Sequence, residues 1–424
     1  MDSEKTHLRA SVPQGHYSDF RLDPLTDRWT LIAEGRGKRP ESISSHRNGG
    51  NGEGGNDKSP TAVSESEAQD AAPRKDCAFC PGNEQITTET VAAIVENPDA
   101  NGEKSSIKTL ERDGNLEGFH WLGRVIENKF PAFRIDPEHF TQPKGFDELR
   151  RLFYDGKLSL KERFFQKIDA VGRHEVAIDA RRHLRGWAEM SEEEIVLAFR
   201  LLQSRLQEFR ASGLYDYAFF FKNVGVNAGA SQPHTHCQLT GNVVIPDDVY
   251  AQVKRVARYE RVRREHGESA SFWEALMEME IEAGLRIVAK TDSFALYCPY
   301  ASRFPLQVEI CPLFDGAFED YDASTLSEVA KLARNALLAL QETKRRYRPF
   351  DLTPLDYNVV MTNQPYRVES DMAVALAVFR PRLAILPSLV KKAGYEHGSG
   401  IDINPIAPET AAAYLRDAFG HLLP

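Results

Sequence analysis

The same order of four elements can be read twice along this chain of 424 residues. In the first half, the residue pattern predicts a strand over His174–Ala180, a helix from Ser191 to about Ala211 and a strand over Asp216–Phe221. A fourth, extended element follows and carries two histidines. Antiparallel strands with long helices against one face make an α+β architecture, so we expect an antiparallel sheet with helices packed on it.

The second half repeats this order with other residues. We expect a strand over Leu306–Ile310, a helix from about Ser324 to Arg346 and a strand over Asp356–Met361. The fourth element is predicted as a strand over Ala373–Phe379, where apolar residues replace the histidines. This half therefore has no chemistry of its own at that place, and we interpret it as a degenerate copy that supports a single site.

The predicted domains are residues 1–245, which carry the histidine strand, and residues 246–424, the degenerate half. A long helical stretch from about 246 to 284 links them. Residues 41–76 are rich in Gly, Ser and Asn and have too little apolar surface to order themselves, so they are predicted to be a flexible insertion. Residues 134–171 form a second predicted insertion, with a short helix around 146–154.

The histidine strand carries the strongest signal for chemistry. Residues 233–238 read Pro-His-Thr-His-Cys-Gln and follow a glycine-rich turn at 225–231. On an extended chain, side chains at i and i+2 share a face, so His234, His236 and Gln238 line one surface. Two imidazoles and an amide beside free backbone N–H groups suit a phosphate whose phosphorus is attacked by nitrogen. The spacing alone is equally compatible with solvated strand residues or a casual metal site.

A Cys-x-x-Cys pair, Cys77 and Cys80, lies far upstream. With only 5 cysteines in the chain, a disulfide scaffold is not expected. The turn residues Pro81-Gly82-Asn83 follow the pair, and they favour a metal knuckle over the strand-to-helix junction of a redox motif. Thiolate ligands prefer zinc.

Two thiolates leave half of a tetrahedral zinc site to be completed by distant residues. Histidine is the natural candidate, and His234 leads because it lies beside the histidine predicted to react. His183, between a predicted strand and a predicted helix, comes next, and His174 and His120 are its rivals. Spacing does not choose among these three.

Taken together, these motifs resemble the galactose-1-phosphate uridylyltransferase family of the histidine-triad superfamily. The similarity extends to Arg21–Ala33 with Arg36–Pro40, to Arg124–Ala132, to His174–His183 and to 393–409. In the last of these segments, the sequence from 396 to 405 is similar to a branch that includes ADP-glucose phosphorylase. Cys237 departs from the family, in which Gly or Ser is usual between the second histidine and the glutamine. The histidines of a second metal site are also missing, because only His397 and His421 follow His266.

The resemblance implies roles for individual residues. It implies zinc on Cys77, Cys80, His183 and His234, with His236 as the covalent nucleophile and Gln238 as a ligand of a phosphoryl oxygen. It also implies a group of substrate-binding residues, namely Arg36, Arg39, Asn128, Asn223, Ser231, Gln232, Tyr395 and Glu396.

The implied activity is transfer of a nucleoside monophosphate from a nucleotide-sugar to a hexose 1-phosphate through a nucleotidyl-histidine. UDP-glucose and galactose 1-phosphate are the leading pair. Neutral imidazole suits this double displacement because its unperturbed pKa is about 6.5. One alternative is an ADP-glucose phosphorylase that uses inorganic phosphate, and another is hydrolysis with water as acceptor. An alternative of another class is a catalytically idle nucleotide sensor.

Composition limits the kinds of partner that this protein is expected to bind. The net charge of −9 argues against a nucleic-acid groove, and no apolar stretch approaches the length of a membrane span. The first residues lack the apolar region of a signal peptide. Thiol ligands and few cysteines fit the reducing cytoplasm. A homodimer is a further expectation.

Overall fold

The computed structural model describes residues 18–34, 73–96, 105–109, 120–134, 164, 170–347 and 353–420. Its centre is a sheet of 11 strands in which every neighbouring pair is antiparallel. From one edge to the other the strands are β4 (Ser105–Thr109), β3 (Thr90–Glu96), β5 (Trp121–Glu127), β6 (Gly172–Ile178), β8 (His236–Asn242), β7 (Tyr217–Val224), β12 (Tyr357–Thr362), β13 (Arg382–Pro387), β11 (Val308–Pro312), β10 (Phe294–Tyr297) and β9 (Ile287–Lys290).

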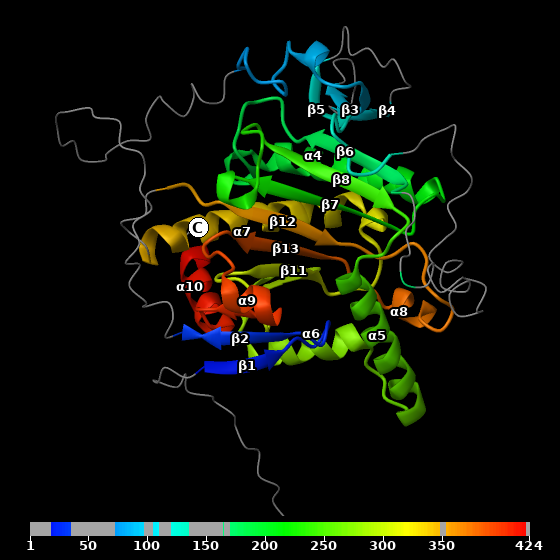
Figure 1. Ribbon diagram of the computed structural model, residues 1–424, viewed down its shortest axis with the longest axis vertical. Helices are drawn as coiled ribbons and strands as arrows, with labels where there is room; N and C mark the ends of the chain where they lie inside the picture. Colours follow the sequence, from blue (N-terminus) through cyan, green and yellow to red (C-terminus); the bar gives the residue numbers. More distant parts are fainter. Residues whose placement is uncertain are drawn as a thin grey trace, which may run out of the picture.

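The strand order is symmetric about the centre of the sheet (Figure 1). The first half contributes β6-β8-β7 and the second half β12-β13-β11, and the two meet where Phe221 of β7 pairs with Val360 of β12. This arrangement confirms an α+β fold of tandem halves. The two halves share one continuous sheet, and a domain boundary at 245/246 stays a prediction.

Two long helices cover one face of the sheet. They are α4 (Glu192–Ala211) and α7 (Ala323–Tyr347), which contact each other behind the sheet in Figure 1. Ser191 and Glu194 form the capping box that begins α4. Apolar side chains from both helices and from the strands of both halves build one core, and α10 (Pro408–Gly420) extends it beside α7.

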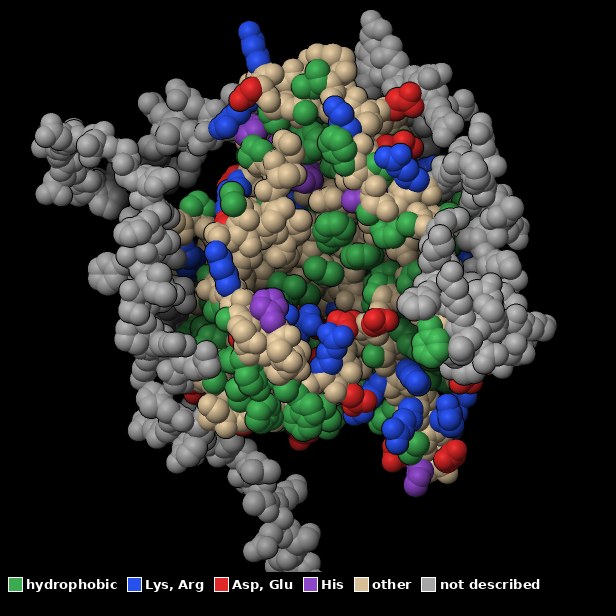
Figure 2. Space-filling model, in the orientation of Figure 1, with side chains coloured by type: hydrophobic (Ala, Val, Ile, Leu, Met, Phe, Trp, Pro, Cys, Tyr) green, Lys and Arg blue, Asp and Glu red, His purple; other side chains and the backbone are tan. Residues whose placement is uncertain are grey.

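The opposite face is covered over the second half. The predicted helical stretch at 246–284 is two helices, α5 (Asp247–His266) and α6 (Phe272–Ala283), and Gly267 ends the first of them in a left-handed conformation. A separate sheet is built from β1 (Ser18–Leu22), β2 (Trp29–Ala33) and β14 (Asp402–Asn404). Figure 2 shows the uncovered part of this face as a hollow with apolar side chains at its floor and histidines on its border.

The fourth element of the second half was predicted in the wrong place. The run Ala373–Phe379 was expected to be a strand, but Ala373–Ala377 is a short helix, α8, and the strand that follows is Arg382–Pro387. A short apolar run does not distinguish a buried strand from a buried helix, and its alanines and leucine favour a helix. The counterpart of the histidine strand is therefore β13, which lies between β11 and β12 as β8 lies between β6 and β7.

The two predicted insertions, 41–76 and 134–171, lie largely outside the described residues. Among the helices that the structure does describe, none is both long and apolar enough to cross a lipid bilayer.

Candidate active site and metal site

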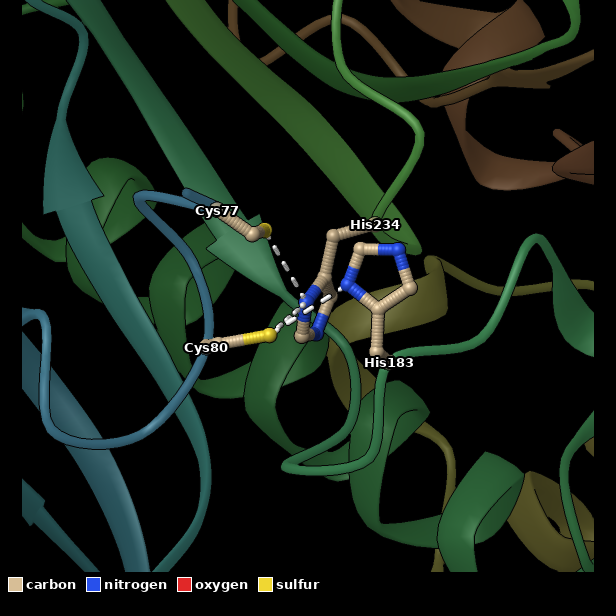
Figure 3. A group of neighbouring side chains, drawn as sticks. All are labelled: Cys77, Cys80, His183 and His234. Atoms are coloured by element: carbon tan, nitrogen blue, oxygen red, sulfur yellow. Dashed lines mark hydrogen bonds between the residues drawn. The ribbon is translucent and has the colours of Figure 1, made fainter. Parts of the chain in front are cut away.

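Four side chains with metal-binding atoms meet beside the start of β8. Cys77 and Cys80 come from the turn before β3, His183 follows β6, and His234 precedes β8; all four are buried (Figure 3). Their ligand atoms lie within 4.8 Å of one another. The sequence separates Cys77 from His234 by 157 positions, and the fold brings them together.

The donor set fits a zinc ion. Zinc–sulfur and zinc–nitrogen bonds in a tetrahedral site place neighbouring ligand atoms about 3.3 to 3.8 Å apart. The Sγ atom of Cys80 lies 3.3 Å from Nδ1 of His183 and 3.5 Å from Nδ1 of His234. The Sγ atom of Cys77 lies 3.6 Å from Nδ1 of His234. Two thiolates and two neutral imidazoles would balance the charge of Zn²⁺, and the structure brings these four predicted ligands together.

A hydrogen bond outside the cluster orients the ring of His234. Its Nε2–H donates to the carbonyl oxygen of Ala180 at 2.9 Å, so Nδ1 is the nitrogen that faces the cysteines. Burial lowers the pKa of His234 to about 4, which keeps the ring neutral. Burial also raises the pKa of the Cys80 thiol, and a cation is the partner that favours its thiolate.

The rival histidines lie elsewhere. His120 is half-exposed, and its Nδ1 lies 3.0 Å from a carboxylate oxygen of Glu96. His174, on β6, contacts Gln238 rather than the cysteines. His183 is therefore the histidine that completes the cluster with His234.

His236 is held with one ring nitrogen bound and the other available. Nδ1–H donates to the carbonyl oxygen of His234 at 2.8 Å, which leaves Nε2 with its lone pair. Burial and the positive charge of Lys222 lower the pKa of His236, so the ring is neutral near pH 7. The ring of Phe79, from between the two cysteines, lies edge-on to it with centroids 5.3 Å apart. A neutral, immobilised imidazole is the form that can act as a nucleophile.

Gln238 shares the face of His236 and belongs to a small polar group. Its Oε1 lies 2.8 Å from Nε2 of His174. Nδ1 of His174 accepts from the backbone N–H of Ala132 at 3.2 Å, and Nδ2 of Asn128 lies 3.2 Å from its Nε2. The predicted substrate-binding residue Asn128 is thereby placed beside the predicted catalytic residue Gln238. The residue between His236 and Gln238, Cys237, points into the core beneath the helices.

A buried ion pair supports the histidine strand from behind. Nζ of Lys222 donates to Oδ2 of Asp179 at 2.6 Å, to Oγ1 of Thr235 at 2.8 Å and to the carbonyl oxygen of His236 at 2.9 Å. The same carboxylate oxygen accepts from Thr235 and from Nε1 of Trp187. Sequence reasoning did not identify this network, although a lysine after three phenylalanines in a predicted strand was a visible signal.

Lys222→Met is expected to lower the free energy of unfolding by about 3–5 kcal/mol, because it leaves the buried carboxylate of Asp179 without a counter-charge. Urea unfolding measures the change. Lys331→Met is the matched control, because Lys331 pairs with Glu192 at the half-exposed surface and a pair of that kind contributes at most about 1 kcal/mol. Equal losses for the two variants would contradict the assigned role of Lys222.

The second half anchors the glycine-rich turn that precedes β8. Oδ2 of Asp356 accepts from the backbone N–H and from Nδ2 of Asn227, at 2.9 and 2.8 Å. Gly225 has a φ of +88°, and a Cβ there would lie 1.8 Å from Oδ1 of Asp356. The turn therefore requires glycine at this position both for its backbone conformation and for the approach of the carboxylate.

Asn358, on β12, reaches into the same region. Its Nδ2 donates to Oδ1 of Asn223 at 2.9 Å and to the carbonyl oxygen of Ala228 at 2.8 Å. Asn223 lies two residues along β7 from Phe221, which pairs with Gln238, so Asn223 and Gln238 lie on the same face of the sheet. A residue of the degenerate half thus orients the amide of a predicted substrate-binding residue.

Asn358→Ala is expected to raise KM for the donor nucleotide about tenfold, because it removes two hydrogen bonds that each contribute about 0.5–1.5 kcal/mol. Steady-state kinetics with varied donor measure the effect, and the melting temperature is recorded beside them. A lower melting temperature with unchanged KM would contradict the prediction.

Two further predicted residues, Ser231 and Gln232, lie exposed on the turn just before the histidine strand. They are adjacent to the site in the chain, and their contact with substrate stays a prediction. Arg36 and Arg39, the predicted phosphate clamp, lie outside the described residues.

Tyr395 and Glu396 belong to a short helix, α9 (Gly394–Ser399). Oε2 of Glu396 accepts from the backbone N–H of Ala393 at 3.0 Å and so caps its own helix. Tyr395 is 43% exposed, which leaves its ring accessible. Their proposed part in substrate binding stays a prediction.

A cavity of about 270 Å³ lies over β7, β12 and β13, next to α5 and α6. Phe219, Gln252, Tyr300, Glu309 and Arg382 are among its lining residues. None of the predicted catalytic or metal-binding residues lines it, so the chemistry belongs to the histidine strand and not to this cavity.

The chain has detectable relatives. The family model for the N-terminal domain of galactose-1-phosphate uridyl transferase matches residues 123–246. ADP-glucose phosphorylase of Arabidopsis thaliana is 25% identical over 404 residues, which cover 94% of this chain and 92% of that protein. Galactose-1-phosphate uridylyltransferase of Neurospora crassa is 24% identical over 441 residues, which cover 96% of each.

Solved structures share the fold. A crystal structure of an Arabidopsis thaliana ADP-glucose phosphorylase with bound ADP-glucose aligns with a TM-score of 0.66 and 22% identity, covering 95% of this chain and 98% of that one. A uridylyltransferase structure aligns with a TM-score of 0.59 and 17% identity, covering 96% and 100%. Both likenesses show that the arrangement of tandem halves is common to these proteins.

Proposed function

We propose that this chain is a nucleotidyltransferase of the galactose-1-phosphate uridylyltransferase family, whose N-terminal domain model matches residues 123–246, and that it works through His236. The observation that carries the proposal is the state of this ring: buried, neutral, and bound through Nδ1 with Nε2 available. The donor is a nucleotide-sugar and the first-choice acceptor a hexose 1-phosphate, with UDP-glucose and galactose 1-phosphate as the leading pair.

The reaction proceeds in two displacements. Nε2 of His236 attacks the α-phosphorus of the donor, and the bond from that phosphorus to the bridging oxygen breaks, so the sugar 1-phosphate leaves. The proton stays on Nδ1, and its hydrogen bond to the carbonyl oxygen of His234 stabilises the positive charge that the ring acquires. An oxygen of the acceptor phosphate then attacks the same phosphorus and releases the neutral imidazole.

Other residues of the site are proposed to position the nucleotide and to stabilise the negative charge of its phosphates. The amide of Gln238 donates to a non-bridging oxygen as negative charge shifts in the transition state. The glycine-rich turn, held by Asp356, presents backbone N–H groups to the phosphates. Asn223 and Ser231 contact the nucleotide, and Arg36 and Arg39 clamp phosphate oxygens with forked donors.

Zinc is the proposed cofactor, held by Cys77, Cys80, His183 and His234. It would supply structural cross-linking and not Lewis-acid chemistry at the phosphate. Because His234 is two residues from His236 and bonds through Nε2 to Ala180, its ring fixes the register of the strand that carries the nucleophile. This role agrees with the complete burial of the cluster.

A second acceptor is favoured by one specific observation. One relative, which matches 94% of this chain, is an ADP-glucose phosphorylase. This likeness supports inorganic phosphate as the acceptor and ADP-glucose as the donor. The covalent step on His236 is the same in both reactions. Only the group that attacks the nucleotidyl-histidine differs.

Four incubations separate the two reactions: UDP-glucose or ADP-glucose, each with galactose 1-phosphate or with inorganic phosphate. We expect consumption of UDP-glucose and formation of UDP-galactose with galactose 1-phosphate. Release of glucose 1-phosphate and a nucleoside diphosphate only with inorganic phosphate would establish the phosphorylase instead. Free monophosphate without any acceptor identifies a hydrolase, and nucleotide binding without turnover in all arms identifies an idle sensor.

We also propose a cytoplasmic location and a homodimer. The location is supported by the reduced thiols that zinc ligation needs.

A further inference from the structure

We propose that His174 is a positioning residue that fixes the orientation of the Gln238 amide so that its NH₂ group, and not its oxygen, faces the reacting phosphate. The inference rests on the proposed function, because it needs an anionic phosphoryl group beside Gln238. His174 was weighed in the sequence only as a rival zinc ligand, and the structure places it beside the amide instead.

The protonation of His174 follows from a backbone contact. The N–H of Ala132 has only one role, that of a donor, and it lies 3.2 Å from Nδ1 of His174. Nδ1 therefore accepts and carries no proton. Burial lowers the pKa of His174, which agrees with a neutral ring. A neutral imidazole with a bare Nδ1 carries its proton on Nε2.

The orientation of Gln238 follows from that proton. Nε2–H of His174 needs an acceptor, and Oε1 of Gln238 lies 2.8 Å away. Rotation of the amide by half a turn would place two N–H donors against each other, and it would turn the carbonyl oxygen toward the phosphate. Both contacts are unfavourable, so His174 selects the rotamer whose NH₂ group points toward the site.

Asn128 contacts the same ring nitrogen of His174 as Gln238 does. Its Oδ1 accepts from the backbone N–H of Phe130 at 2.9 Å, so its own amide orientation is fixed with Nδ2 toward His174. Nδ2 lies 3.2 Å from Nε2, so a proton on Nε2 makes this a contact between two donors, which opposes the arrangement. The two hydrogen bonds of the ring, from Ala132 to Nδ1 and from Nε2 to Gln238, outweigh this one contact.

The packing of His174 is independent of this role. Its ring lies against Phe221 with centroids 6.4 Å apart, and its side chain spans from the segment after β5 to the catalytic strand. A variant that removes the ring changes packing, loop anchoring and amide orientation together. The test therefore needs two variants, one that keeps a hydrogen-bonding group at the position of Nδ1 and one that keeps such a group at the position of Nε2.

His174→Gln and His174→Asn form that pair. A glutamine amide can place its NH₂ group where Nε2–H lies, and an asparagine amide reaches only as far as Nδ1. His174→Asn retains an acceptor for Ala132 but loses the donor to Gln238, so we expect kcat to fall about tenfold with KM within about twofold, the loss of one transition-state hydrogen bond. His174→Gln is expected to regain most of that loss.

A double-mutant cycle tests whether the effect passes through Gln238. In the Gln238→Ala background, His174→Asn should cause no further loss of kcat, because there is no amide left to orient. The control is His120→Asn, which alters the half-exposed rival histidine and should change neither kcat nor KM. Zinc content and melting temperature are measured for every variant.

The outcomes are distinct. Equal kcat for His174→Asn and the wild type, or the same loss with and without Gln238, would overturn the inference while transfer by the wild type still supports the proposed function. If His174→Gln lost as much as His174→Asn in a folded protein, the Nε2 proton would not be what matters, and the inference would again fail. A wild type that forms no nucleotidyl intermediate would instead overturn the proposed function itself.

Discussion

His236→Ala is expected to abolish nucleotidyl transfer, with kcat reduced about 10⁴-fold or more, because it removes the imidazole that is proposed to form the covalent bond to phosphorus. The intact mass of the wild type, mixed with a nucleotide-sugar and no acceptor, should increase by one nucleoside monophosphate less water. The variant should show no increment. The same measurement identifies the base, because uridylyl and adenylyl groups differ in mass.

Zinc content and stability separate this result from a structural effect. The ring of His236 is not one of the four clustered ligands, so the variant should keep its zinc and melt within a few degrees of the wild type. His397→Ala, on the exposed surface of α9, is the matched histidine control and should keep full activity. If a folded, zinc-loaded His236→Ala exchanged label between donor and acceptor at the wild-type rate, the covalent mechanism would be wrong.

Patterns that depend on neighbours in the sequence were predicted well. His236 and Gln238, predicted to share a face from their i, i+2 spacing, lie two residues apart on β8, and the helix predicted from Ser191 begins there with a capping box. Both signals depend on backbone geometry over a few residues, which the sequence encodes directly. The symmetry of the two halves followed from the repeated order of elements.

Contacts between distant segments were not predictable in the same way. Spacing did not distinguish His183 from His174 or His120, because the choice depends on where the turn after β6 meets the cysteine knuckle. The partner of Lys222 is a carboxylate at the end of β6, and nothing local to either residue indicates the pairing. The contact of Asn358 with Asn223 depends on the pairing of β12 with β7, which joins the two halves and which the sequence did not indicate.

The site therefore depends on both halves although its reacting groups come from one. The first half supplies the proposed nucleophile, the four proposed metal ligands and the glycine-rich turn. The second half supplies the carboxylate of Asp356, just before β12, and the amide of Asn358 on β12, and both hold that turn. β13 has no histidine and completes the sheet, and through the anchoring residues we expect the second half to affect substrate affinity.

Cys80→Ser is expected to cause the largest loss of stability. Cys80 is fully buried and contacts both histidines of the cluster, and structural zinc in small domains contributes apparent binding energies of about 10–16 kcal/mol. The variant should bind less than one zinc per chain and melt well below the wild type, and activity should fall with the loss of order in the catalytic strand. Metal analysis and thermal unfolding measure these changes without reference to turnover.

Cys311→Ser supplies the matched control for this prediction. Cys311 is equally buried, but its Sγ lies 3.4 Å from the carbonyl oxygen of Pro312, which a serine hydroxyl can also use. Its zinc content and activity should equal those of the wild type. If Cys80→Ser kept a full complement of zinc, or if a chelator that removes zinc left the melting temperature unchanged, the cluster would not be the structural metal site that holds His236 in place.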